Sequence, residues 1–172
     1  MLKMILVDIQ YQNDIRKLFL QNLEETHPIF MREFNIDLNI KDAIEKDMAK
    51  LKQFAPPEGR LIIAEFDAQK AGSVALRKIG ENIGEVKRMY VKPEFRRKGI
   101  GRALLQAIID EASKIGYSKI QLDTPYFATA AQSLYREFGF QETSPYPESD
   151  IPEHLHPQWI FMELVIATPT SP

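Results

Sequence analysis

The chain has 172 residues, 44% of them hydrophobic and 27% charged, and this composition excludes wholesale disorder. It contains no cysteine, which excludes a disulfide scaffold, a cysteine-ligated zinc site and a cysteine acyl-enzyme. The formal net charge of −2 argues against a general nucleic-acid binder, and no apolar run is long enough to span a membrane.

We therefore expect one domain over residues 1–168 and a frayed tail over 169–172, with neither a nucleic-acid nor a membrane partner. The absence of cysteine fits a reducing compartment, so the cytoplasm is the expected location. Monomer and homodimer remain open alternatives.

The first third of the chain is expected to form a strand and two helices. Residues 2–9 are apolar and β-branched, which predicts a strand. Apolar residues at three- and four-residue spacing follow Asn13 and predict a helix that ends at Pro28. A second helix is expected over residues 39–54, because two prolines follow it directly.

The middle and end of the chain alternate between strands and helices. Short, turn-rich gaps separate three strand-like runs, which predicts antiparallel hairpins. These strands are expected over 61–67, 70–79 and 83–91. An amphipathic helix over 99–116, a strand over 119–124, a helix over 129–138 and a strand over 159–166 are expected to follow. This order of elements predicts a mixed α/β (α+β) domain.

Positive charge is concentrated between Lys87 and Arg102, where seven cations and one anion give a charge of +6 and leave −8 for the rest of the chain. The segment reads as a strand, a short basic loop with Gly99 and Gly101, and the start of a long helix. A helix N-terminus presents unpaired N–H groups, and glycines let the backbone approach an anion closely. The pattern favours a phosphate or pyrophosphate site, and a solvated basic face is the alternative.

Two sequence blocks resemble those of the GCN5-related N-acetyltransferases (the GNAT family). RRKGIG, residues 96–101, resembles the family's R/Q-x-x-G-x-G/A signature, and SLYREFGF, residues 133–140, resembles its A-x-x-L-Y-x-x-x-G-F block. Residues 89–93 look like the family's fourth strand and its exit. The resemblance implies a mixed, mostly antiparallel sheet of about six to seven strands flanked by about four helices. It also implies acetyl-CoA bound between the fourth and fifth strands.

The resemblance further implies which residues contact the acyl-CoA. Backbone groups of Met89, Tyr90 and Val91 belong to the strand that would bind the pantetheine arm as an added strand. The pyrophosphate would lie on the loop formed by Arg96, Arg97, Lys98, Gly99, Ile100, Gly101 and Arg102. Many relatives carry a cofactor-contacting asparagine where this chain has Ala128, so that contact is expected either to be lost or to be made by a neighbour such as Thr129 or Gln132.

Acyl transfer to an amine needs a base for the amine, N–H donors for the oxyanion and an acid for the leaving thiolate. Tyr135 matches the family's tyrosine acid, and packing within its helix is the alternative interpretation. Glu85 matches a glutamate base of several members and, by two-residue periodicity, shares a face with Lys87, Met89 and Val91. Asp123, in the next strand, is the competing base.

We expect an acyl-CoA-dependent N-acetyltransferase that transfers the acetyl group directly, in a ternary complex, to a primary amine of a small molecule, amino acid or peptide. Acetylation of a protein N-terminus or lysine and a non-catalytic acyl-CoA-binding module are the alternatives. The −8 outside the basic segment weakly favours a cationic acceptor. Acceptor specificity is assigned to the first two helices and residues 144–157. His154 and His156 lack a third ligand at typical spacing, so no metal is expected.

Overall fold

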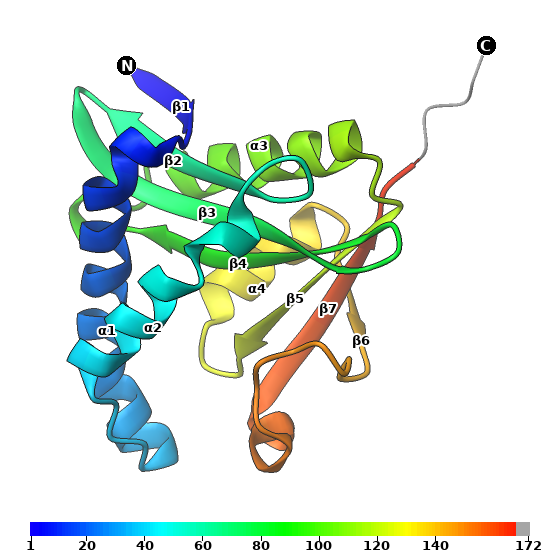
Figure 1. Ribbon diagram of the computed structural model, residues 1–172. Coiled ribbons are helices and arrows are strands. Elements are labelled where there is room, and N and C mark those ends of the chain that lie inside the picture. The colour runs from blue at the N-terminus through cyan, green and yellow to red at the C-terminus, as the bar shows by residue number, and fades with distance from the viewer. Residues whose placement is uncertain (168–172) are drawn as a thin grey trace.

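The computed structural model describes residues 1–167, and its centre is a single seven-stranded sheet (Figure 1). The strand order is β1-β2-β3-β4-β5-β7-β6. The strands are β1 Leu2–Leu6, β2 Arg60–Phe66, β3 Gln69–Gly80, β4 Ile83–Val91, β5 Lys119–Pro125, β6 Gln141–Thr143 and β7 Trp159–Val165. Only β4 and β5 run parallel, and every other neighbouring pair is antiparallel. The predicted mixed, mostly antiparallel sheet is therefore confirmed.

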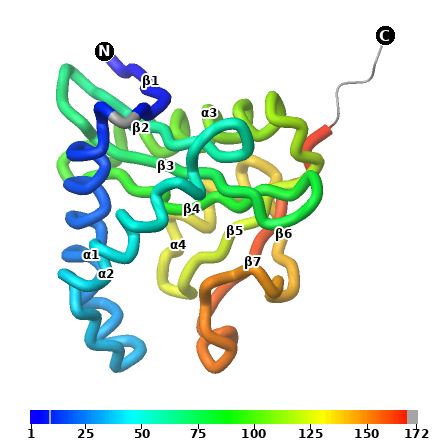
Figure 2. The backbone as a smooth tube through the Cα atoms, in the orientation of Figure 1, coloured from blue at the N-terminus to red at the C-terminus, as the bar shows by residue number. Residues whose placement is uncertain are grey.

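Helices cover both faces of this sheet (Figures 1 and 2). The α-helices are α1 Gln12–Phe34, α2 Ile40–Ala49, α3 Ile100–Ile115 and α4 Thr129–Glu137. Short 3₁₀ helices lie at η1 Ile9–Tyr11, η2 Leu51–Phe54, η3 Pro93–Phe95 and η4 Glu153–Gln158. One buried cluster joins α1 and α2 to the sheet, and a second joins α3 and α4 to its other face. Within residues 1–167 no helix is both long and apolar enough to cross a bilayer.

Helix α3 shows how the sequence pattern produces this packing. Its buried residues Ile100, Leu104, Ile108 and Ala112 recur at intervals of four and form one face against the sheet. The helix ends at Gly116, whose left-handed φ of 102° and N–H bonds to the last turn form the predicted C-terminal cap. The long helix that follows the basic loop is thereby fixed on the sheet.

The prediction that the first helix ends at Pro28 is wrong, because α1 continues to Phe34. An interior proline removes one backbone hydrogen bond and costs about 3 kcal/mol. The last turns of α1 offset this cost through aromatic packing. The ring centroids of Phe30 and Phe34 lie 5.9 and 5.1 Å from that of Trp159.

Strand β4 contains an irregularity that shapes the centre of the molecule. Ser73 of β3 pairs with Tyr90 and Ala75 with Lys87, so β4 holds one extra residue, and Arg88 has a φ of +52°. The bulge reverses the side-chain alternation. Met89 therefore packs with α3, while Glu85 and Lys87 lie together on the other face. The prediction that Glu85, Lys87, Met89 and Val91 share one face is wrong for this reason.

Candidate active site

A cavity of about 410 Å³ lies where β4 and β5 separate. The two strands pair only over Ile83–Glu85 and Lys119–Gln121, after which they diverge (Figure 1). The walls of the cavity come from both strands, α1, α4 and the segment before β7. They include Asn22, Thr26, Phe30, Val86, Lys87, Arg88, Met89, Leu122, Asp123, Thr124, Phe127, Ala128, Ala131, Tyr135, Asp150, Ile151 and Trp159. Two of the three predicted catalytic residues, Asp123 and Tyr135, thus reach one cavity, whereas Glu85 does not line it.

Tyr135 enters this cavity from α4, with 6% of the residue exposed. Its hydroxyl makes no hydrogen bond to another residue within 1–167. Burial, and then the negative charge of Asp123, raise the pKa of Tyr135 above its ordinary value of 10.0. The phenol therefore stays protonated and can donate a proton into the cavity.

Asp123 enters the same cavity from β5, and within residues 1–167 it accepts hydrogen bonds only from neutral donors. Trp159 donates to Oδ1 from Nε1 at 3.2 Å, and Ser149 donates to Oδ2 from its hydroxyl at 3.0 Å. The Tyr146 hydroxyl lies 3.5 Å from Oδ2. No lysine, arginine or histidine within residues 1–167 forms an ion pair with this carboxylate, so its charge is available to a bound cation.

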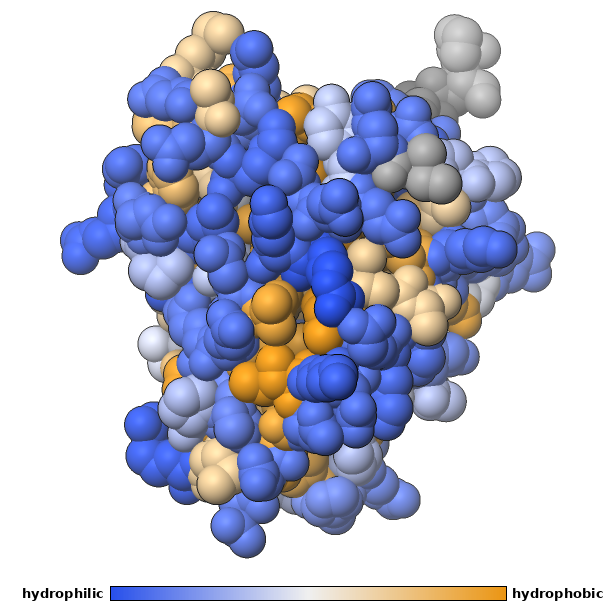
Figure 3. All heavy atoms as spheres, turned by 60° about the vertical axis from the view of Figure 1, so that its left-hand side comes forward, coloured by the Kyte–Doolittle hydropathy of each residue, from blue (hydrophilic) through white to orange (hydrophobic). Residues whose placement is uncertain are grey.

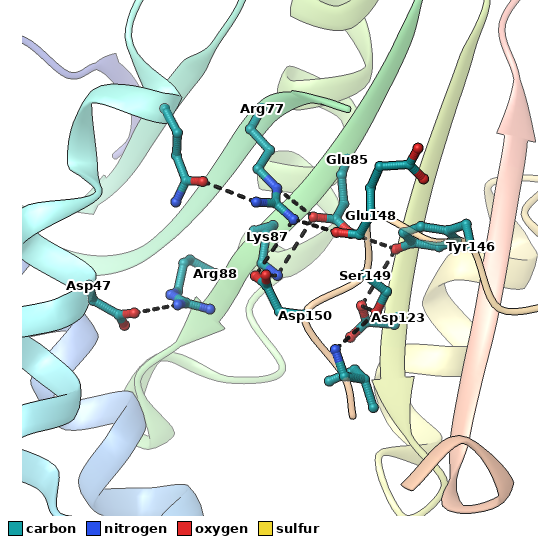
Figure 4. Close-up of polar contacts among 12 residues, drawn as sticks. Asp47, Arg77, Glu85, Lys87, Arg88, Asp123, Tyr146, Glu148, Ser149 and Asp150 are labelled. Carbon is teal, nitrogen blue, oxygen red and sulfur yellow. Dashed lines mark hydrogen bonds and ion pairs between the residues drawn. The ribbon is translucent and has the colours of Figure 1, made fainter. Parts of the chain in front are cut away.

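Glu85 is also buried, with 1% of the residue exposed, but its carboxylate is already engaged (Figure 4). Arg77 donates to Oε1 from Nε at 2.7 Å, and Tyr146 donates its hydroxyl proton to Oε2 at 2.7 Å. Lys87 Nζ lies 3.6 Å from Oε1. Glu85 therefore connects β3 to the segment before β7 instead of facing the cavity.

The segment from Tyr146 to Asp150 lies within residues 144–157, to which the sequence assigned acceptor specificity, but its polar contacts with the site were not predicted. Arg77 donates to the Glu148 carbonyl at 2.9 Å, and Lys87 donates to Asp150 at 2.8 Å. Burial, followed by the charges of Glu85 and Asp123, raises the pKa of Tyr146. Arg77, Glu85 and Lys87, which contact this segment, lie far from it in the sequence and form no motif with it. The only signals are an aromatic residue and a serine in a polar loop.

The predicted pyrophosphate loop forms a second cavity, of about 260 Å³. Its lining contains six of the seven predicted loop residues together with Val91: Arg96, Arg97, Gly99, Ile100, Gly101 and Arg102. Gly99 precedes α3 with a φ of +77°, and a Cβ there would meet nothing within 4 Å. The backbone at this helix start is therefore open to a ligand. Lys98 lies outside the lining, with Nζ 5.3 Å from the Phe66 and Phe95 ring centroids.

The cations of this loop differ in the hydrogen bonds and ion pairs that they form within the protein. Arg96 donates from Nε to the Val91 carbonyl at 2.9 Å and also pairs with Glu25 of α1. Arg102 pairs with Glu137 of α4. Met89 lines the larger cavity and Val91 the smaller one, so β4 runs from one cavity to the other.

The remaining predicted cofactor residues lie off these walls. The Tyr90 side chain is on the α1 face, where its hydroxyl donates to Glu25 at 3.1 Å. Gln132 donates its amide to the carbonyls of Pro125 and Tyr126 at 3.0 and 3.1 Å and thus braces the turn between β5 and α4. Thr129 is exposed at the start of α4. Ala128, the residue before Thr129, does line the larger cavity.

The histidine pair also has a structural context. His156 Nε2 lies 3.0 Å from the Ile151 carbonyl, and its ring packs 5.1 Å from that of Phe161. Across residues 1–167 no three histidine, aspartate or glutamate side chains are grouped in a way that would hold a metal ion.

Comparison with known proteins identifies the class. Residues 23–140 match the sequence model of the acetyltransferase (GNAT) family. An uncharacterized N-acetyltransferase of Schizosaccharomyces pombe is 34% identical over 129 residues, which are 74% of this chain and 79% of that protein. The chain therefore belongs to the GNAT family and is an acyl-CoA-dependent N-acetyltransferase.

Two further comparisons concern a relative of named activity and a solved structure. Human N-acetylaspartate synthetase is 36% identical over 102 residues, which are 58% of this chain but only 34% of that protein. The PaiA N-acetyltransferase of Thermoplasma acidophilum, solved with coenzyme A, shares the fold with a TM-score of 0.73 at 18% identity, covering 96% of this chain and 99% of that one. A structure of the same fold thus holds the coenzyme that the predicted donor contains.

Proposed function

We propose that this enzyme transfers the acetyl group of acetyl-CoA directly to a primary amine of a small molecule, amino acid or peptide, within a ternary complex. The observation that carries the proposal is that Asp123, a carboxylate with no ion-pair partner within residues 1–167, and Tyr135, a buried, protonated phenol, face the same cavity. A volume of about 410 Å³ suits a small acceptor together with the reactive end of the donor.

Acetyl-CoA is proposed to lie along β4, from one cavity to the other. From Val86 to Val91 this strand pairs with no neighbour on the β5 side among residues 1–167, so its backbone can bond an extended pantetheine arm. The pyrophosphate would bind the N–H groups between Arg97 and Arg102 at the start of α3. The cationic side chains of the loop would add a salt-sensitive attraction.

The proposed chemistry uses one group at each end of the reacting centre. Asp123 accepts a proton from the acceptor ammonium, and the free amine attacks the thioester carbon. The carbon–sulfur bond then breaks, Tyr135 gives its proton to the departing thiolate, and the second proton that the amide nitrogen must lose returns to the Tyr135 phenolate. Asp123 suits the first role better than Glu85, because Arg77 and Tyr146 already hold the Glu85 carboxylate.

The test compares isosteric changes at the two carboxylates. We expect Asp123→Asn to lower kcat by about 10²- to 10⁴-fold, because it removes the general base. We expect Glu85→Gln to lower kcat by less than about tenfold, since its effect is transmitted through Arg77 and Tyr146. CoA release with a panel of primary amines gives the rates. Unchanged acetyl-CoA affinity in both variants is the control, and equal activity of wild type and Asp123→Asn would refute the assignment.

Two further features bear on the finer assignments. The relative named N-acetylaspartate synthetase supports an amino acid as acceptor over a protein N-terminus or lysine. The absence of cysteine fits a reducing compartment, and we place the enzyme in the cytoplasm.

A further inference from the structure

Three cations, Arg77, Lys87 and Arg88, are drawn around the site in Figure 4, and they differ in what they can still bind. Arg77 is engaged by Glu85, Gln53 and the Glu148 carbonyl, and it does not line the cavity. Lys87 lines the cavity, but Asp150 at 2.8 Å holds its ammonium group. The third cation, Arg88, therefore decides which anion the cavity can accept.

Arg88 keeps unused hydrogen-bond donors at the cavity wall. Its only ion-pair partner within residues 1–167 is Asp47 of α2, which accepts from one terminal nitrogen, Nη2 (Figure 4). Within residues 1–167 its Nε also has no hydrogen-bond partner, but this atom is buried, so a ligand would bind the terminal nitrogens. A guanidinium carries five N–H donors in a rigid fork, so this one retains capacity for a carboxylate.

The backbone holds Arg88 in this position at a conformational cost. A φ of +52° is uncommon for a side chain with a Cβ, and such conformations concentrate at functional sites. The hydroxyl of Ser73, which is fully buried, donates to the Arg88 carbonyl at 3.2 Å and fixes the bulge. The bulge turns Lys87 and Arg88, which are consecutive, toward the same face and the same cavity.

The rest of the cavity complements the other parts of an amino acid. Asp123 offers a carboxylate that no cation of residues 1–167 neutralises, which suits an ammonium group. Phe30, Phe127 and Trp159 provide an aromatic wall, with Phe30 centroids 6.4 and 5.9 Å from the other two. Elsewhere in the molecule, the face drawn in Figure 3, which brings the left-hand side of Figure 1 forward, is largely hydrophilic with apolar side chains along its middle.

We propose that the acceptor is a free amino acid with an apolar, preferably aromatic, side chain, whose carboxylate binds Arg88 while its amine lies at Asp123. The inference rests on the proposed function and adds the class of acceptor to it. It replaces the expectation of a purely cationic acceptor, because the charged residues lining the cavity are two cations and two anions: Lys87, Arg88, Asp123 and Asp150.

The experiment measures CoA release with the twenty L-amino acids and then compares L-phenylalanine with phenethylamine. These two amines share the aromatic ring, and only the first has a carboxylate. We expect kcat/KM of the wild type to be at least about tenfold higher for phenylalanine, through a lower KM. Arg88→Gln should lower kcat/KM for phenylalanine by about 10- to 100-fold and for phenethylamine by less than about threefold, and Arg88→Lys should restore part of the loss.

Arg16→Gln is the matched control, because Arg16 also pairs with an acid of α2, Glu45, but does not line the cavity. It should leave both rates unchanged. If Arg88→Gln does not fold, the wild-type preference for phenylalanine over phenethylamine still decides.

The outcomes separate the two proposals. Acetylation of amines but of no free amino acid, or equal rates with phenylalanine and phenethylamine, would overturn this inference and leave the proposed function intact. Acetyl-CoA binding without acetylation of any amine would overturn the proposed function, and this inference with it.

Discussion

Tyr135, Tyr146, Glu85 and Asp123 lie close together, and their hydrogen-bond partners indicate different roles. Tyr146 donates a hydrogen bond from its hydroxyl to Glu85, and this pair fastens the segment before β7 to the sheet. Among the residues that the structure describes, Tyr135 has no such partner, and Asp123 accepts hydrogen bonds only from neutral donors. The Tyr146–Glu85 pair therefore has a structural role, while Tyr135 and Asp123 can still form hydrogen bonds with a ligand in the cavity.

Replacing Tyr135 with phenylalanine tests the proposed acid. The change removes one oxygen from a buried ring and should leave packing against Phe140, at 5.7 Å between centroids, intact. We expect kcat to fall by about 10²- to 10⁴-fold, because the thiolate loses its proton donor. Steady-state CoA release gives kcat. Isothermal titration with acetyl-CoA should show an unchanged affinity, and a variant as active as the wild type would exclude this role.

The same tyrosine makes a prediction about pH. Its pKa lies above the ordinary value of 10.0, so the protonated form that acts as the acid persists throughout the neutral and mildly alkaline range. Ionisation of Tyr135 should therefore cause no decline of kcat between about pH 7 and pH 10. A kcat profile over this interval is the measurement. A falling limb near pH 8 that disappears in Tyr135→Phe would contradict the expected direction.

Sequence motifs predicted the parts of the site that are local in the chain. The basic loop and Tyr135 each belong to a short block next to a helix, and the structure places both on cavities. Arg88 was outside the prediction because the bulge arises from the pairing of β4 with β3. Period-two reasoning assumes regular pairing, so it assigned the neighbouring side chains to the wrong faces.

At the scale of elements, β2 and α3 are joined by a partly buried ion pair. Arg60 donates from Nε to Glu111 at 2.8 Å, and Lys114 donates to the other oxygen of the carboxylate at 2.7 Å. The hydrogen bond from Lys114, and then that from Arg60, lowers the pKa of Glu111. The charged form of Glu111 therefore stabilises the folded state.

Glu111→Gln should lower the free energy of unfolding by about 1–3 kcal/mol at pH 7. Because the folded pKa is below the unfolded value of about 4.3, this contribution is complete above that value and disappears as the pH falls through the folded pKa. Urea denaturation of both proteins at pH 7 and at pH 3.5 should show a smaller difference at the lower pH. A difference that grows on acidification would contradict the argument.

Most elements were predictable because their patterns are strong and local. The three strands of the meander, α3 and its glycine cap agree with the sequence prediction to within one or two residues. Two features were missed because distant contacts decide them. Strand β6 has only three residues and exists through its pairing with β7, and α1 passes Pro28 because its last turns pack on Trp159.

At the scale of the whole molecule, the proposed donor would touch both halves of the sheet. It would run along β4, reach the start of α3 and end beside α4. Because the folded state alone has this site, acetyl-CoA at ~100 times its dissociation constant should stabilise the protein by about 2.7 kcal/mol. Thermal unfolding with acetyl-CoA, with ATP and NAD as controls, measures this. Equal shifts with all three would indicate a general response to phosphates instead.

Trp159 gives the molecule a built-in optical reporter. It is the only tryptophan in the sequence, and it lies in the cavity wall with its indole N–H on the proposed base and its ring on the end of α1. Any charge that arrives at Asp123 changes the electric field across this indole. The tryptophan emission of the unlabelled protein therefore comes from the acceptor side of the site alone, free of contributions from other indoles.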